Sequence, residues 1–151
     1  NIVGLRFFTV YGPYGRPDMT PFSFIKNFYK DLPIKVFNYG KHKRDFTYID
    51  DAINSVINLF LILTKKKNKS FFEIYNIAKG KSEKLNDYIK FLEKEISSKF
   101  KKIYLDEQLG DVQNTFADIN KIKKIIKYKP QVNLKNGVSK FVTWYKKYYK
   151  V

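Results

Sequence analysis

The chain has 151 residues, of which 44% are hydrophobic and 18% aromatic, so it suits one domain, or part of one, with a sizeable core. It has no cysteine, which excludes a disulfide framework and a thiolate metal site, and no apolar run of about 18 residues that could span a membrane. The net charge of +16 would suit a polyanionic partner. However, all but three of the 30 basic residues are lysine, as expected from an AT-rich genome, and they are spread along the chain. This pattern favours a solvated basic surface over a nucleic-acid site.

The first predicted element is an apolar strand at residues 2–10, of the kind buried in parallel sheets. A helix is predicted after Pro21, and Pro33 ends it. Residues 34–38 then form a short strand, which a turn at Tyr39 and Gly40 follows. The expected inward face of the helix carries Phe22, Ile25 and Tyr29.

The second half of the chain continues this alternation. Asp50 or Asp51 is expected to cap a helix, a polar loop covers residues 65–70, and residues 71–78 form a second buried strand. A helix, a short strand, a short helix capped by Asp118 and a closing helix are predicted at residues 85–96, 103–105, 119–125 and 138–149. Strands that alternate with helices indicate an α/β architecture.

The loop that follows the first strand, residues 11–18, reads YGPYGRPD and is the first candidate site. Ligands of open α/β sheets bind where strands end in such loops. Gly12 and Gly15 allow close backbone approach, and Arg16 offers a planar donor fork that suits a carboxylate. On composition alone, an ordinary turn-rich connection stays open.

A second candidate site comprises Lys35, Phe37, Arg44 and Asp45. An aromatic residue at a strand end can pack against a flat base, and Arg44 can bind a diphosphate with Asp45 orienting its guanidinium. The alternative for the two adjacent charges is a surface ion pair. The single histidine, His42, is expected to be exposed and receives no role, and no His, Asp or Glu spacing suggests a metal site.

Several of these segments resemble one family. Residues 4–19, GLRFFTVYGPYGRPDM, are similar to the strand and loop of UDP-glucuronate 4-epimerases, which are extended short-chain dehydrogenase/reductases, although Tyr14 and Thr20 stand where that family usually has Trp and Ala. The segment KRDFTYIDD resembles the family pattern RDF-Y-I-DD, and QLGDV at residues 108–112 resembles Gln-Pro-Gly-Asp-Val. Residues 75–93 and 137–145 also match, so the resemblance runs the whole length of the chain.

The resemblance implies a fold class: α/β, the C-terminal portion of a Rossmann-type extended short-chain dehydrogenase/reductase, with late sheet strands and the small substrate-binding domain. The chain has no Gly-rich dinucleotide fingerprint and no Tyr-x-x-x-Lys pair on a helix before its first strand, and the family places both upstream. Residues 1–151 are therefore expected to form a single partial unit, in which the last Rossmann strands interleave with the nucleotide-sugar-binding domain and from which the N-terminal NAD-binding portion is missing. The catalytic Tyr and Lys would lie upstream, so these residues alone are expected to be inactive.

The resemblance also implies residue roles. Phe7 would face the nicotinamide of NAD, Thr9 would lie beside the sugar ring, and Arg16 near the sugar carboxylate. The backbone around Lys35 and Phe37 would meet uracil, Arg44 the phosphates, and Asp111 the ribose and phosphate of a UDP-sugar.

The whole enzyme would be a cytoplasmic homodimer that interconverts UDP-glucuronate and UDP-galacturonate through NAD, with no nucleic-acid or membrane partner. Three alternatives stay open. They are another NAD-dependent nucleotide-sugar epimerase or dehydratase, a non-catalytic nucleotide-sugar-binding remnant, and a basic nucleic-acid-binding protein. Arg16 discriminates the first, because it has a purpose if the sugar carries a carboxylate.

Overall fold

The chain alternates between strands and helices throughout the computed structural model, which describes residues 1–65 and 70–151. Most of the polar loop predicted at residues 65–70 lies outside the described residues. The strands are β1 (Ile2–Phe7), β2 (Thr9–Tyr11), β3 (Ile34–Phe37), β4 (Lys43–Arg44), β5 (Phe46–Tyr48), β6 (Phe72–Ile77), β7 (Glu83–Lys84) and β8 (Lys102–Leu105). The helices are α1 (Thr20–Tyr29), the 3-10 turn η1 (Asn38–Gly40), α2 (Ile49–Leu63), α3 (Leu85–Glu95), α4 (Asn120–Ile126) and α5 (Leu134–Tyr149).

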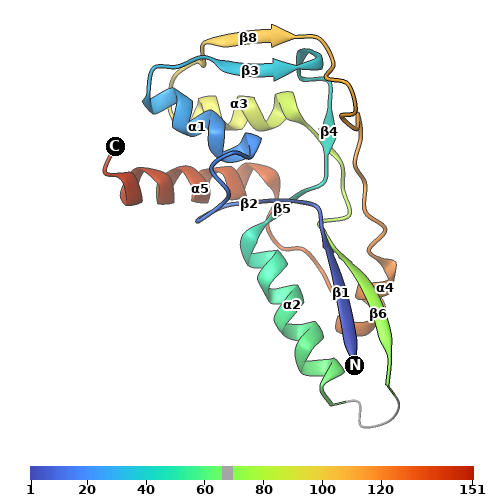
Figure 1. The fold of residues 1–151 in the computed structure, drawn as a ribbon. Helices are drawn as coiled ribbons and strands as arrows, with labels where there is room; N and C mark the ends of the chain where they lie inside the picture. The colour runs from blue at the N-terminus through green and yellow to red at the C-terminus, as the bar shows by residue number, and fades with distance from the viewer. Residues whose placement is uncertain (66–69) are drawn as a thin grey trace.

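These elements form two lobes (Figure 1). One lobe contains α1, α3, α5, β3 and β8, and the other contains β1, β6, α2 and α4, with β2 and β5 where the lobes meet. Each lobe has its own hydrophobic core: Tyr88 and Phe141 are fully buried in the first, and Tyr75 and Ile77 in the second. The chain passes from one lobe to the other several times, so neither lobe is a continuous stretch of sequence.

Most strand pairs are parallel, as the α/β prediction requires. β1 pairs with β6, β2 with β5 and β3 with β8 in parallel, whereas β4 and β7 are antiparallel. The strand predicted at residues 2–10 is broken at Phe8. Before the break β1 pairs with β6, and after it β2 pairs with β5. This break carries the chain from one lobe to the other.

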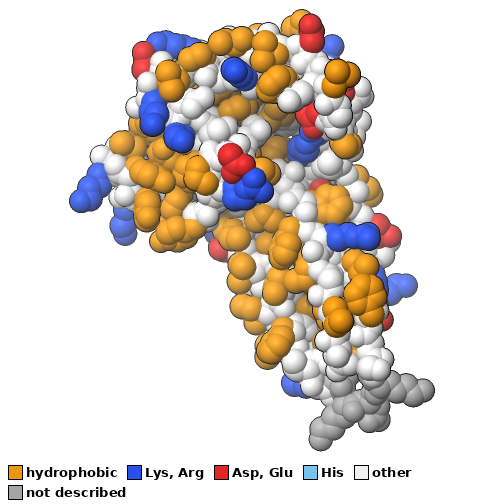
Figure 2. Space-filling model, viewed as in Figure 1, with side chains coloured by type: hydrophobic (Ala, Val, Ile, Leu, Met, Phe, Trp, Pro, Cys, Tyr) orange, Lys and Arg blue, Asp and Glu red, His pale blue; other side chains and the backbone are white. Residues whose placement is uncertain are grey.

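The first strand has the apolar composition of a strand buried in a parallel sheet, but in this structure it is covered on one side only. Ile2 and Phe7 are 63% and 53% exposed, since among the described residues β1 hydrogen bonds only to β6 and packs against α2 on one side. Figure 2 shows hydrophobic side chains over this face, and the exposed ones on α2 include Ile53, Ile57 and Phe60. No helix in the described ranges is long and apolar enough to cross a membrane.

The helix starts differ in part from the predictions. Tyr48 is the N-cap of α2, and neither Asp50 nor Asp51 caps it, which corrects the prediction for this pair. The Asp51 carboxylate instead accepts hydrogen bonds from the backbone N–H groups of Gln131 and Val132, both at 3.0 Å. This side chain therefore fastens the segment that leads into α5 onto the start of α2.

Helix α5 packs closely against the strands that join the lobes. It starts earlier than predicted because the Asn133 side chain accepts a hydrogen bond from the Asn136 N–H, which caps the helix. A Cβ atom at Gly137 would lie 2.0 Å from the hydroxyl oxygen of Tyr11, so only glycine allows this approach. The Tyr11 hydroxyl also donates to the carbonyl of Leu134 at 3.4 Å, which fixes β2 against the helix.

A buried carboxylate holds the end of α3, and it makes the first lobe sensitive to acid. Burial alone would raise the pKa of Glu93, but hydrogen bonds from Lys102, Lys99 and the Phe100 N–H together lower that pKa below its ordinary value of 4.5. A carboxyl group with a lowered pKa in the folded state stabilises the fold above its unfolded-state pKa, and this contribution is lost as the pH falls through the lowered value.

We therefore expect Glu93→Gln to lower the free energy of unfolding at pH 7 by about 1.5–3 kcal/mol, as for hydrogen bonds to a charged group. The difference from the unsubstituted protein should shrink as the pH falls below 4.5. Urea unfolding at a series of pH values measures both effects. Glu95→Gln, on the same helix, is the matched control, and a gap that stays constant with pH would contradict the assignment.

Candidate functional site

A cavity of about 200 Å³ lies between the start of α1, the strands β3 and β4, and the segment after β8. Five of the seven site residues predicted from the sequence line it: Thr9, Lys35, Phe37, Arg44 and Asp111. They come from positions far apart in the chain, and β4 is fixed between β7 on one side and a bridge from Lys43 to Asn114 on the other. The structure thus brings together the residues that the resemblance assigns to the nucleotide.

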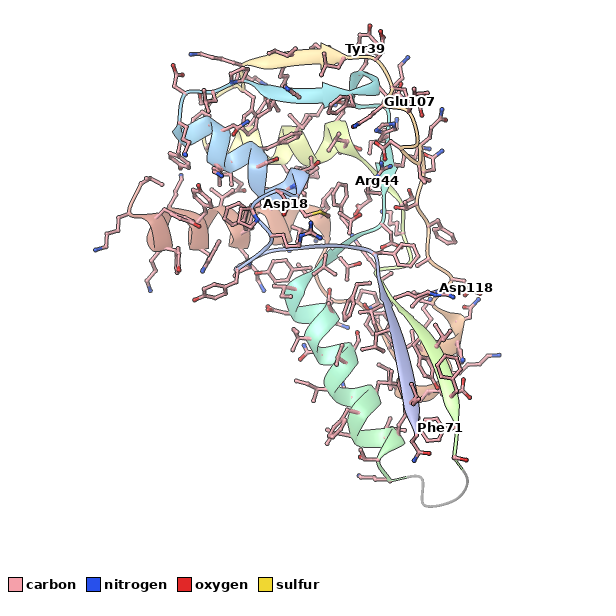
Figure 3. All side chains as sticks on the ribbon, in the orientation of Figure 1. Asp18, Tyr39, Arg44, Phe71, Glu107 and Asp118 are labelled. Carbon is pink, nitrogen blue, oxygen red and sulfur yellow. The ribbon has the colours of Figure 1, made fainter. Side chains whose placement is uncertain are left out.

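Arg44 is the most firmly held cation of this cavity (Figure 3). Its Nη2 atom donates to Asp111 Oδ1 at 2.7 Å, and its Nη1 atom donates to the carbonyls of Lys43 and Gln113 at 3.0 and 3.1 Å. The side chain is only 19% exposed. A guanidinium fixed on its edges in this way keeps its position without a ligand, which is a property of anion sites.

Asp45 does not orient Arg44, and the prediction that it does is wrong. Its carboxylate is fully buried, and Oδ1 accepts from the Lys79 N–H at 2.9 Å and Oδ2 from the N–H groups of Gly80 and Ala117 at 3.0 and 3.3 Å. Burial raises the pKa of this carboxyl group. Asp45 is therefore a structural residue that joins the loop at residues 79–80 to Ala117. Asp111, and not Asp45, is the carboxylate that binds the guanidinium of Arg44.

His42 is buried, contrary to the sequence prediction of an exposed side chain. It is 3% exposed and lines the cavity. Its Nδ1 atom lies 3.4 Å from Asp111 Oδ2, and its Nε2 atom lies 3.8 Å from Glu107 Oε1. The basic residues around His42 in the sequence indicated that its side chain is exposed to solvent. Its two acidic neighbours, Glu107 and Asp111, lie too far along the chain for a local pattern to reveal them.

Arg16 and Phe7 are not in this cavity. They line a second, open cavity of about 550 Å³, together with Phe8, Val10 and Ile53 among others. Met19 lines both cavities, so the two are neighbours. Most of the side chains around the second cavity are apolar, which suits a flat ring.

Arg16 pairs with Asp18, which lines the first cavity (Figure 3). Two hydrogen bonds join them, one from Nε at 3.2 Å and one from Nη2. These bonds lower the pKa of the Asp18 carboxyl and raise that of the Arg16 guanidinium. Because both side chains are largely exposed, at 72% and 64%, another carboxylate can replace Asp18 at little cost.

Within the described part of the chain, no group of three or more His, Cys, Asp or Glu side chains is placed to hold a metal ion. The polar groups of the first cavity are instead arranged around Arg44, with Lys35 as a second cation. The site is thus suited to a ligand with negative charge and a flat ring.

Comparison with known proteins agrees with this reading of the fold. The chain is 42% identical over 145 residues to an uncharacterized protein of Methanocaldococcus jannaschii, and 42% identical over 147 residues to a UDP-glucuronate 4-epimerase of Thermodesulfobacterium geofontis. These matches cover 96% and 97% of this chain and 43% of each relative. The chain therefore spans less than half the length of the relatives that it matches.

A solved structure shows the same fold. The UDP-glucuronic acid 4-epimerase of Bacillus cereus, in complex with UDP-glucuronic acid and NAD, superposes with a TM-score of 0.86 at 36% identity. The match covers 98% of this chain and 46% of that chain. This likeness confirms the predicted α/β fold of the extended short-chain dehydrogenase/reductase type.

The model of the NAD dependent epimerase/dehydratase family matches residues 1–78, just over half of the chain. The parallel strand pairs, the cavity around Arg44 and the likeness to solved epimerases agree with that match. The chain belongs to the NAD dependent epimerase/dehydratase family.

Proposed function

We propose that this chain supplies the nucleotide-sugar pocket of an NAD-dependent enzyme that interconverts UDP-glucuronate and UDP-galacturonate by oxidation and reduction at C4. The observation that carries the proposal is the cavity in which Lys35, Phe37, Arg44 and Asp111 converge, beside a second cavity that Arg16 lines. The Thermodesulfobacterium geofontis and Bacillus cereus proteins, both named UDP-glucuronate or UDP-glucuronic acid 4-epimerases, support it.

In this proposal the first cavity binds the nucleotide. Arg44 binds the diphosphate, because its guanidinium is held at the cavity wall by three acceptors and is only 19% exposed. The backbone around Lys35 and Phe37 meets uracil at the end of β3. Asp111, whose carboxylate is an acceptor, serves a ribose hydroxyl as well as Arg44.

The sugar would lie where the two cavities adjoin. Thr9, at the start of β2, lines the first cavity beside Asp18 and Met19. Arg16 would exchange the carboxylate of Asp18 for that of the glucuronate, since both are planar acceptors that suit its fork. The pair with Asp18 would then hold Arg16 ready in the absence of substrate.

NAD fits the second cavity in part. Phe7 is 53% exposed there, and the apolar side chains around it suit the nicotinamide ring. When bound, NAD would accept a hydride from C4 of the sugar and return it to the opposite face. The residues of this chain would bind and orient the substrate, and we assign no acid–base residue to it.

The lobes can be assigned in the same way. We propose β1 and β6 as the last strands of the Rossmann sheet, and the lobe of α1, α3 and α5 as the substrate lobe. The full-length protein is proposed to work as a homodimer in the cytoplasm, as the family resemblance implies.

Arg16→Ala should leave UDP and UDP-glucose binding nearly unchanged and weaken UDP-glucuronate binding by about 10- to 100-fold, because only the last ligand has a C6 carboxylate. Arg16→Lys should restore little of this loss, since an ammonium lacks the bidentate geometry. Calorimetric titration of the full-length protein with the three ligands measures both effects. Asp18→Asn is the complementary variant, and it should strengthen UDP-glucuronate binding by up to about fivefold, because Arg16 then has no competing carboxylate.

A second candidate is an NAD-dependent epimerase or dehydratase that acts on a neutral nucleotide sugar. The observation that favours it is the pair with Asp18, which already occupies the fork of Arg16. The same titration decides between the two. If Arg16→Ala lowers the affinity for all three ligands equally, the assignment of Arg16 to a carboxylate is wrong and the neutral sugar is preferred.

A further inference from the structure

The segment that follows β8, residues 106–113, is fixed at both ends, and between these ends it faces the buried ring of His42. At one end β8 pairs with β3, and at the other the Lys43 N–H donates to the carbonyl of Gln113 at 2.9 Å. Between these ends, Glu107 and Asp111 both turn toward His42. This loop, which we call the 106–113 loop, forms one wall of the nucleotide cavity through Asp111.

The imidazole of His42 lies between the two carboxylates. Its side chain is 4% exposed, its Nδ1 atom faces Asp111 at 3.4 Å, and its Nε2 atom faces Glu107 at 3.8 Å. The Nε2 atom is buried without a hydrogen-bond partner in the described ranges. An imidazole ring nitrogen that carries an N–H is a hydrogen-bond donor, and here each ring nitrogen faces a carboxylate.

Asp111 links this ring to the proposed phosphate site. Its Oδ2 atom faces His42, while its Oδ1 atom accepts the hydrogen bond from Arg44 at 2.7 Å. Glu107 is held in turn by the side-chain amide of Gln113, which donates to Oε2 at 2.9 Å. The charged groups that face His42 are thus Glu107 and Asp111 of the loop, with Arg44 of β4 one contact away.

We propose that His42 is a positioning residue for the diphosphate site, which acts by holding Asp111 and thereby the 106–113 loop and the guanidinium of Arg44. The inference rests on the proposed function of Arg44. Without the imidazole, the carboxylates of Asp111 and Glu107 lose the donor between them, and their negative charge opposes an incoming diphosphate. Asp111 is also freed to turn away from the geometry that keeps Arg44 at the cavity wall.

The test compares substitutions that keep different nitrogens. Asn places an amide nitrogen near the position of Nδ1, toward Asp111, whereas Gln reaches toward the position of Nε2 and Glu107. In UDP titrations of the full-length protein, we expect His42→Phe and His42→Gln to weaken binding by about 10- to 100-fold, and His42→Asn to stay within about threefold. A residue that only fills space would give no such difference between Asn and Gln.

A double-mutant cycle tests the route through Asp111. If His42 acts through that carboxylate, His42→Asn and His42→Gln should bind UDP equally in an Asp111→Asn background. A difference that persists there overturns the proposal, as does equal binding of UDP by His42→Gln and the unsubstituted protein. These variants keep a polar side chain, so the test does not depend on the folding of His42→Phe.

Arg44→Ala separates this inference from the proposed function. If Arg44→Ala loses UDP affinity while His42→Phe and His42→Gln keep it, the phosphate site stands and the role of His42 is wrong. If Arg44→Ala binds UDP as well as the unsubstituted protein does, both are overturned.

Discussion

Asp45→Ala should lower the free energy of unfolding by about 2 kcal/mol or more, because it leaves the backbone N–H groups of Gly80 and Ala117 without an acceptor and each such group costs about 1–3 kcal/mol. The Lys79 N–H also donates to this fully buried carboxylate, but it keeps the Thr47 hydroxyl oxygen as a second acceptor, at 2.9 Å. Urea unfolding followed by circular dichroism at pH 7 measures the loss.

The isosteric variant Asp45→Asn sharpens this test. The side-chain amide keeps one acceptor oxygen, which can serve Gly80 and Ala117 in place of Oδ2, but its NH2 group then faces the Lys79 N–H, so that two donors oppose each other. We expect Asp45→Asn to lower the free energy of unfolding less than Asp45→Ala does, but still by more than about 1 kcal/mol, which is the typical cost of one unsatisfied buried group. Asp50→Asn, at an exposed position a few residues later, should change stability little, and equal effects at the two positions would refute the role of Asp45.

Arg44→Ala should weaken the binding of UDP, UDP-glucose and UDP-glucuronate alike, by about 10- to 150-fold, because the diphosphate is common to all three. This range corresponds to the loss of hydrogen bonds to a charged group, about 1.5–3 kcal/mol. Arg44→Lys should recover only part of the affinity, since an ammonium cannot donate to Lys43, Gln113 and Asp111 in the same plane.

The neighbouring cation supplies the control for Arg44. Lys43→Ala removes one positive charge from the same strand at an exposed position, and it should leave UDP affinity nearly unchanged. Calorimetric titration of the full-length protein at fixed ionic strength measures each variant. Equal losses for Lys43→Ala and Arg44→Ala would mean that net charge, and not the placement of Arg44, attracts the nucleotide.

The sequence predicted the fold well where the signal is local. The α/β alternation is confirmed, and Phe22 and Ile25 of the predicted inward face of α1 are buried. The residues of β1 are typical of a buried strand, but they do not show how much of it is covered, because burial depends on which elements pack against a strand. The prediction that Asp51 caps a helix was wrong for a related reason, because its carboxylate oxygens accept hydrogen bonds from the distant N–H groups of Gln131 and Val132.

In the candidate site, too, some residues were placed correctly from the sequence and others were not. Thr9, Lys35, Phe37, Arg44 and Asp111 share one cavity, although the roles given to them stay predictions. His42 and Asp45 were assigned wrongly because their partners come from the segments at residues 79–80 and 107–117, which no local pattern brings near them. A side chain whose environment is made by distant segments cannot be placed from its neighbours in sequence.

The interleaved path of the chain through its lobes limits how this part of the protein can be rearranged by recombination. Since each lobe is assembled from several separate stretches, no single exchange of a gene segment transfers the lobe of α1, α3 and α5 intact. Gly137 and Tyr11 illustrate the constraint, because a contact that tolerates no added methyl group joins the first strands to the last helix. New substrate preferences in such a protein are therefore expected to arise by substitutions in the loops around the cavities, with the two lobes inherited together.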